Sequence, residues 1–247
     1  MKQGAKLAMI GILGVLAGAG AAVLATGQVP GKEAVTMDRA SVEKIVREYI
    51  LTHPEILPEA MQNLERKESA QRLKSQGNSI AQPFAGAWEG AADGDVTLVE
   101  FFDYACGYCR QAQPDVERLL SEDKRLRVVY RELPILGPPS EEGTRASLAV
   151  AKLGGNYAAF HRALFKAGRP SPEAIDAALL AAGVDAKAAR DLGNSEEISK
   201  EIKANLAFQQ SLGISGTPSW IIGDQVIGGA VGYDDLKSAI AEARGNN

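Results

Sequence analysis

Residues 101–110 read FFDYACGYCR and contain the only two cysteines of the 247-residue chain, Cys106 and Cys109. An apolar, strand-favouring run over residues 97–102 leads into this stretch, and a pattern typical of a helix follows it over residues 111–120. A C-x-x-C pair that ends a strand and opens a helix is a redox motif. The sequence therefore predicts a thiol-based active site at this point of the chain.

The segments around the motif predict an α/β fold. Strand, helix and strand at this spacing form a right-handed βαβ unit with parallel strands. A long region rich in alanine and leucine, divided by glycines, then predicts an insertion of four or five helices, and a β-hairpin and a closing helix follow. The predicted elements cover residues 96–102, 106–120, 127–133, 141–212, 214–222, 225–229 and 233–244.

The first 25 residues have the layout of a secretory signal peptide. Lys2 and Lys6 form a basic start, residues 7–24 are uncharged and apolar, and small residues suit cleavage after Ala25. An uncleaved membrane anchor is the alternative, because the apolar run approaches spanning length. Both interpretations place the rest of the chain outside the cytoplasm.

The overall composition is that of an ordinary globular protein. The chain is 45% hydrophobic and 23% charged, with a formal net charge of −4. It has no basic stripe, so we expect no nucleic-acid partner. An exported chain with one cysteine pair has no disulfide framework, which favours a working pair over a structural one.

Residues 37–76 predict two helices. His53-Pro54 separates them, because the residue before a proline avoids the helical region. The first carries an amphipathic stripe, and the second, over residues 55–76, has a narrow apolar stripe on a charged surface. This helical pair is too small to fold around its own core, so we predict an oligomerisation arm; packing on the main domain is the alternative. Residues 77–95 predict a linker or an irregular edge segment. The stripe of the first helix consists of Val42, Ile45, Val46, Tyr49 and Ile50.

The two cysteines are expected to divide the chemistry. Only a thiolate attacks a disulfide. Cys106 begins the predicted helix, where unpaired backbone N–H groups and the helix dipole favour the anion. Cys109 lies one turn further in, so we assign attack to Cys106 and resolution of the mixed disulfide to Cys109.

Two other positions are candidate site residues. Glu100 lies in the strand that leads to the cysteines; as a buried carboxylate it can move a proton to or from Cys109, whereas an exposed strand glutamate is the alternative. Thr217 and Pro218 stand just before a strand, where a cis peptide bond suits a tight turn and an ordinary trans proline is the alternative.

No cofactor or metal is expected. A zinc site needs two more ligands than the cysteines supply, and the only histidines, His53 and His161, are far away in the sequence. The remaining metal hypothesis is a soft-metal site on Cys106 and Cys109 alone.

The motifs together resemble a known family. VEFFDYACGYC over residues 99–109, the helical insertion and Gly-Thr-Pro-Ser over residues 216–219 are similar to the DsbA-like thioredoxin-fold oxidoreductases of bacterial envelopes, from residue 96 to 243. Residues 46–57 resemble the N-terminal extension of the suppressor-of-copper-sensitivity, or ScsC-type, branch, which is associated with self-assembly.

The resemblance implies a thioredoxin fold, a periplasmic location, protein substrates and a membrane redox partner. It matches Cys106 to the nucleophile, Cys109 to the resolving cysteine, Pro218 to the cis-proline and Glu100 to the acidic position.

The residues beside these positions favour one direction of the reaction. Gly107-Tyr108 between the cysteines and Thr217 before the proline look like the disulfide isomerase DsbC. We therefore expect an isomerase or reductase; a DsbA-like oxidase and a copper-binding envelope protein are the alternatives.

Overall fold

The computed structural model describes residues 38–245, so the predicted signal peptide lies outside the described residues. Among the helices within this range, none is both long and apolar enough to cross a membrane. The described residues fall into two units, one that ends at Leu57 and one that begins at Pro58.

In the first unit, helix α2 spans Arg39–Thr52. Its first turn is capped by Asp38, whose side chain accepts the backbone N–H of Ser41 at 2.7 Å. The helix buries no residue, and its apolar stripe is about half exposed, as at Ile45 and Tyr49. An amphipathic helix in this state has an apolar face that is still available for a partner.

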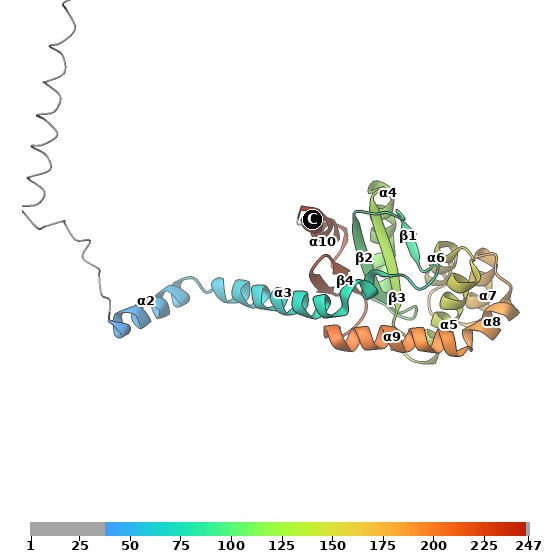
Figure 1. The fold of residues 1–247 in the computed structure, drawn as a ribbon, viewed down its shortest axis with the longest axis horizontal. Helices are drawn as coiled ribbons and strands as arrows, with labels where there is room; N and C mark the ends of the chain where they lie inside the picture. The colour runs from blue at the N-terminus through green and yellow to red at the C-terminus, as the bar shows by residue number, and fades with distance from the viewer. Residues whose placement is uncertain (1–37, 246–247) are drawn as a thin grey trace, which may run out of the picture. The chain divides into compact units, whose positions relative to one another are not determined.

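A five-stranded sheet of order β1-β3-β2-β4-β5 forms the centre of the second unit (Figure 1). β2 and β3 pair in parallel and every other neighbouring pair is antiparallel. This arrangement confirms the predicted α/β fold class, with its parallel βαβ unit and β-hairpin. The strands are β1 (Trp88–Gly90), β2 (Val96–Phe102), β3 (Leu126–Glu132), β4 (Ser219–Ile222) and β5 (Gln225–Gly228).

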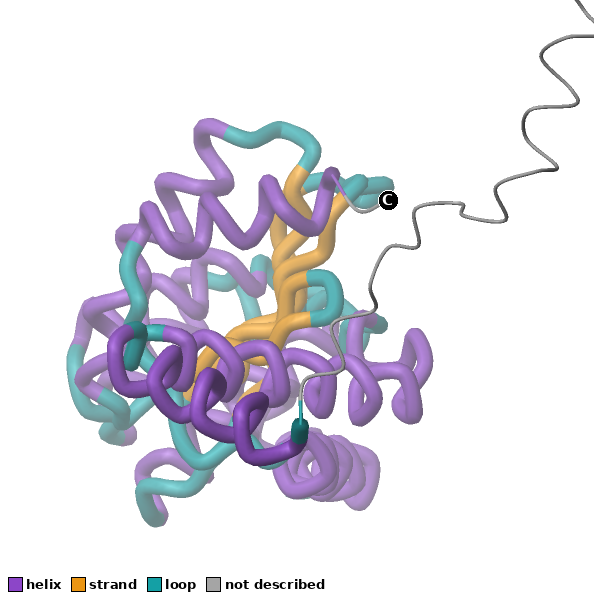
Figure 2. The backbone as a smooth tube through the Cα atoms, turned by 90° about the vertical axis from the view of Figure 1, so that its left-hand side faces the viewer, coloured by secondary structure: helices purple, strands orange, loops and turns teal. Residues whose placement is uncertain are grey.

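Helices lie on both sides of these strands (Figure 2), because alternate side chains of each strand point to opposite faces. On one face Leu98, Phe102 and Trp220 pack with α4 (Gly107–Glu122) and α10 (Tyr233–Gly245). On the other face Val99 and Ile221 pack against the ends of α3 and α9. The remaining helices are α3 (Ile56–Gln76), α5 (Pro138–Leu153), α6 (Tyr157–Ala167), α7 (Pro172–Ala181), α8 (Ala186–Gly193) and α9 (Glu196–Leu212).

Of the two interpretations of residues 77–95, the structure has the edge segment and not the linker. These residues contain the 3₁₀ helix η1 (Gly77–Ala81) and the edge strand β1, which pairs with β3. The buried Arg131 side chain ties this segment to the sheet, because its guanidinium donates to the carbonyl oxygens of Ser79 at 2.8 Å and Ile80 at 3.2 Å. The segment is therefore an integral part of the domain.

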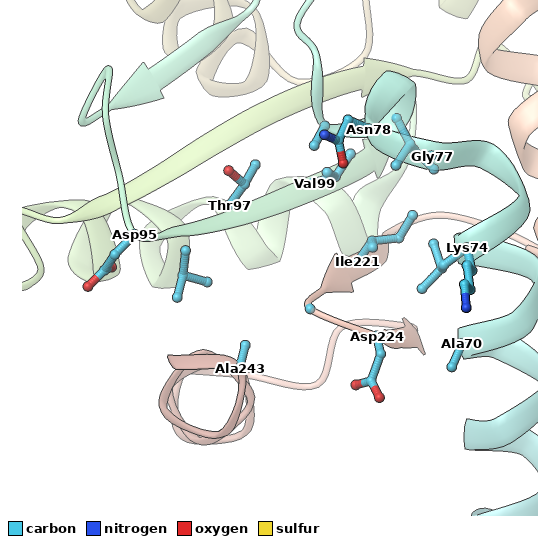
Figure 3. A pocket seen from close by; sticks show the side chains of 15 residues that line it. Ala70, Lys74, Gly77, Asn78, Asp95, Thr97, Val99, Ile221, Asp224 and Ala243 are labelled. Atoms are coloured by element: carbon cyan, nitrogen blue, oxygen red, sulfur yellow. The ribbon is translucent and has the colours of Figure 1, made fainter. Parts of the chain in front are cut away.

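A cleft of about 590 Å³ opens beside the first half of β2 (Figure 3). Its largely apolar lining includes Val99, Ile221 and Ala243, and it contains neither cysteine. Asp95, which also lines it, immediately precedes β2, whereas the cysteines follow the other end of that strand. The cleft thus lies away from the candidate site.

Candidate active site

The two cysteines occupy the turn from β2 into α4. Cys106 is the N-cap of α4, and its Sγ accepts the backbone N–H of Cys109 at 3.4 Å. Cys106 is 6% exposed and Cys109 is fully buried. Both are free thiols. Cys106 is therefore the more accessible of the two thiols.

The predicted proline loop lies directly against this thiol. The Thr217–Pro218 peptide bond is cis. Cys106 Sγ donates to the carbonyl oxygen of Thr217 at 3.3 Å, across 111 residues of sequence. This contact arises because β4 starts at Ser219, which pairs with Phe101 near the end of β2. The sheet register therefore brings both predicted elements together.

Glu100 is the buried carboxylate of the two alternatives considered for it, and not an exposed strand glutamate. It has no solvent exposure, and Gln113 Nε2 donates to its Oε1 at 3.4 Å. Its Oε2 has no hydrogen-bond partner among the described residues. Burial raises the pKa of Glu100 to about 8, and the negative charges of Glu89 and Cys106 add to the rise. This carboxyl group can exchange a proton near neutral pH.

Burial also raises the pKa of Cys109 well above its usual range, and the charges of Glu100 and Cys106 act in the same direction. A buried thiol of this kind is a poor nucleophile until a base removes its proton. The geometry thus separates an accessible thiol, Cys106, from a protected thiol that needs help to ionise.

Asp103 is a structural part of the site that was not among the predicted site residues. Its Oδ1 accepts the N–H of Ala105 at 2.7 Å, and its Oδ2 accepts the N–H groups of Ile135 and Leu136 at 2.9 and 3.0 Å. The carboxylate therefore fixes the cysteine turn to the loop that follows β3. The bond between Asp103 and the N–H group two residues later is a turn signal that a sequence can show. The bonds to Ile135 and Leu136 have no such local signal.

A buried polar network beside the site was also missed. Ser147 Oγ and Tyr157 Oη each donate to Glu132 at 2.8 Å, and Tyr104 Oη lies 2.9 Å from Ser147 Oγ and 3.1 Å from His161 Nδ1. Burial raises the pKa of Glu132 to about 7 and lowers the pKa of His161 to about 3. His161 is thus part of the core, and Tyr104 is buried, whereas Tyr108 is 66% exposed beside Cys106.

Within residues 38–245, no group of three or more histidine, cysteine, aspartate or glutamate side chains is placed to hold a metal ion.

A reactive C-x-x-C at a helix N-terminus, facing a cis-proline loop on this sheet, defines a thioredoxin-fold thiol–disulfide oxidoreductase. The model of the DSBA-like thioredoxin domain matches residues 97–241. The chain belongs to the DSBA-like thioredoxin family. A second model, the copper resistance protein ScsC N-terminal domain, matches residues 38–71, which confirms the predicted ScsC-type resemblance.

Solved structures agree with this assignment. A thioredoxin-like oxidoreductase from Silicibacter pomeroyi DSS-3 is 37% identical, over 68% of this chain and 98% of that one, with a TM-score of 0.64. A periplasmic thioredoxin-like protein from Salmonella enterica serovar Typhimurium is 28% identical, over 68% and 95%, with a TM-score of 0.62. Proteus mirabilis ScsC in a transitional conformation is 28% identical, over 86% and 99%, with a TM-score of 0.65.

Curated relatives match only in part. The Na⁺/H⁺ antiporter NhaA 1 of Salinispora arenicola is 24% identical over 156 residues, which are 62% of this chain and 24% of the antiporter. NhaA 3 of Salinispora tropica is 37% identical over 67 residues, 10% of its length. The chain thus spans a quarter or less of these relatives.

Proposed function

We propose that the protein is a periplasmic thiol–disulfide oxidoreductase that isomerises or reduces disulfides of protein clients. The observation that carries this proposal is the position of Cys106 Sγ, at the N-terminus of α4 and 3.3 Å from the Thr217 carbonyl oxygen, above a fully buried Cys109. The periplasmic relative from Salmonella supports the location. A membrane redox partner would restore the working oxidation state of the pair.

In the proposed reaction, the Cys106 thiolate attacks one sulfur of a client disulfide. The client S–S bond breaks, a mixed disulfide with Cys106 forms, and the departing sulfur leaves as a thiolate. During isomerisation, that client thiolate attacks another client disulfide, and a client thiolate finally displaces Cys106. During reduction, Cys109 attacks Cys106 Sγ, the pair becomes a disulfide, and two electrons pass to the client.

Glu100 is the proposed base for the second route. Cys109 must lose its proton before it attacks, and the ionised form of Glu100, whose share grows as the pH rises towards its pKa of about 8, can accept that proton. Glu100 returns the proton when the pair is reduced again. The buried position of both groups supports this role, because bulk water reaches neither.

The direction of the reaction is tested with scrambled ribonuclease. We expect the reduced protein to restore ribonuclease activity, because the Gly107-Tyr108 dipeptide and Thr217 favour isomerisation. The same assay with fully reduced ribonuclease and oxidised protein measures oxidase activity. Refolding in the second assay alone would assign the protein to the oxidases.

A copper-binding role is the second candidate, because the model matched at residues 38–71 is described as a copper resistance domain. The two thiols are soft ligands that suit Cu(I). Competition with a chromogenic Cu(I) chelator, with the Cys106→Ser variant as control, separates this role from catalysis.

The N-terminal helices are proposed to assemble copies of the protein. We expect light scattering to give an oligomer for the chain without residues 1–25 and a monomer when residues 26–76 are also absent. The physical reason is the exposed apolar stripe of α2, including Val46 and Tyr49, which association would bury. A milder control is Val46→Glu, which should weaken assembly without shortening the chain; a monomer in every form would contradict the proposal.

A further inference from the structure

A second cleft, of about 560 Å³, lies between α3 and the β4–β5 hairpin. This volume is within the range of sites that bind ligands of moderate size. One wall consists of α3 side chains that include Arg66 and Arg72, and the other includes Ser215, Ser219 and Val226. α3 thus lines a cleft of the catalytic domain with its middle turns.

The cleft is lined by residues on both sides of the proline loop. Ser215 and Ser219 stand two residues before and two residues after Thr217, whose carbonyl oxygen contacts Cys106 Sγ. β5, on the far side, is the last strand of the sheet, and an edge strand offers backbone groups to an extended chain. A polypeptide with one cysteine at Cys106 can therefore extend over the proline loop into this cleft.

Hydrogen-bond donors on α3 favour an acidic segment of that polypeptide. Arg72 donates to Ser69 through Nη2 at 3.2 Å, but its buried Nε has no acceptor among the described residues. Arg66 makes no ion pair or side-chain hydrogen bond within residues 38–245. Arg72 Nη1 lies 3.6 Å from Glu68 Oε2, and Glu65 lines the same wall, so the donors that remain open to a ligand are the Arg66 guanidinium and Arg72 Nε. A carboxylate is the acceptor that fits guanidinium donors best.

We infer that α3 forms a wall of the client cleft, and that Arg66 and Arg72 select extended client segments with aspartate or glutamate near the reacting cysteine. This inference rests on the proposed function. It gives the second N-terminal helix a role in substrate selection, separate from any role in assembly.

The test compares two model peptides that carry the same disulfide, one with three aspartates and one with three lysines beside the cysteine. For Arg66→Glu we expect the ratio of kcat/KM for the aspartate peptide to that for the lysine peptide to fall about ten-fold. The substitution turns the attraction for the aspartate peptide into repulsion, and it turns the repulsion of the lysine peptide into attraction. The change should shrink with added salt.

Lys67→Glu is the matched control, because Lys67 is exposed on the same helix and does not line the cleft. It changes the net charge equally and should keep the wild-type ratio. Equal ratios for Arg66→Glu and Lys67→Glu would overturn the inference. The wild-type protein is also assayed with neutral hydroxyethyl disulfide; no turnover of that compound or of either peptide would instead refute the proposed function.

Discussion

Replacing Cys106 by serine is expected to lower the turnover of protein disulfides by at least about 10³-fold, because a hydroxyl group does not replace a thiolate in attack on sulfur. Cys106 is the only thiol with solvent exposure, so Cys109 is not placed to substitute for it. Reduction of insulin by the protein in the presence of a dithiol measures the loss. A Cys106→Ser variant with full activity would refute the enzymatic proposal.

Cys109→Ser is the matched control, since it removes a thiol of the same motif but leaves the attacking group. We expect this variant to form mixed disulfides with clients and to release them slowly, because no internal thiol resolves them. Mass spectrometry of the intact protein shows the trapped adducts. Adducts on Cys109 in the Cys106→Ser variant would reverse our division of roles.

Local patterns in the sequence were sufficient to predict most of the fold. β2 alternates apolar side chains towards both faces, and α4 shows an apolar stripe, so their periods are visible in the sequence. β1 was missed because three residues are too few to show a period, and its place is decided by pairing with β3. The role of residues 77–95 likewise depends on Arg131, more than 50 residues away.

The residues of the candidate site were likewise predicted only in part from the sequence. Cys106 and Cys109 carry a recognisable spacing, and a proline before a strand marks the loop. Glu100 left two interpretations open, since the face of a strand that meets the core is decided by packing. The role of Asp103 was missed because it bonds to N–H groups 32 and 33 residues later in the chain.

Glu100→Gln is expected to slow the resolution of mixed disulfides by Cys109 by about 100-fold, the lower range for loss of a general base. Glutamine keeps the size of the side chain and its partner Gln113 but cannot accept a proton. In the wild type, the resolution rate should rise with pH up to about 8, where Glu100 ionises. Stopped-flow measurement of thiol release from a Cys106 mixed disulfide gives both the rate and its pH profile.

The same substitution also changes how the free energy of unfolding depends on pH. The raised pKa of Glu100 determines the direction of that change. The carboxyl group of Glu100 ionises near its ordinary value of 4.5 in the unfolded chain and near 8 in the folded protein. Between these pH values only the folded state holds the proton, so the free energy of unfolding falls as pH rises from about 4.5 to about 8. Glu100→Gln should remove this decrease, which amounts to a few kcal/mol in the free energy of unfolding. Urea unfolding of both proteins at about pH 4.5 and at about pH 8 measures it.

Glu132→Gln separates catalysis from stability. Glu132 is also fully buried, and its pKa is raised to about 7, but it is hydrogen-bonded by Ser147 and Tyr157 of the helical insertion. Its substitution should flatten the pH dependence of stability between about 4.5 and 7 and leave the resolution rate near that of the wild type. If both variants resolve mixed disulfides equally fast, Glu100 is a buried carboxyl group without a part in proton transfer. If only Glu100→Gln is slow and loses the rise towards pH 8, the proton of Cys109 passes through Glu100.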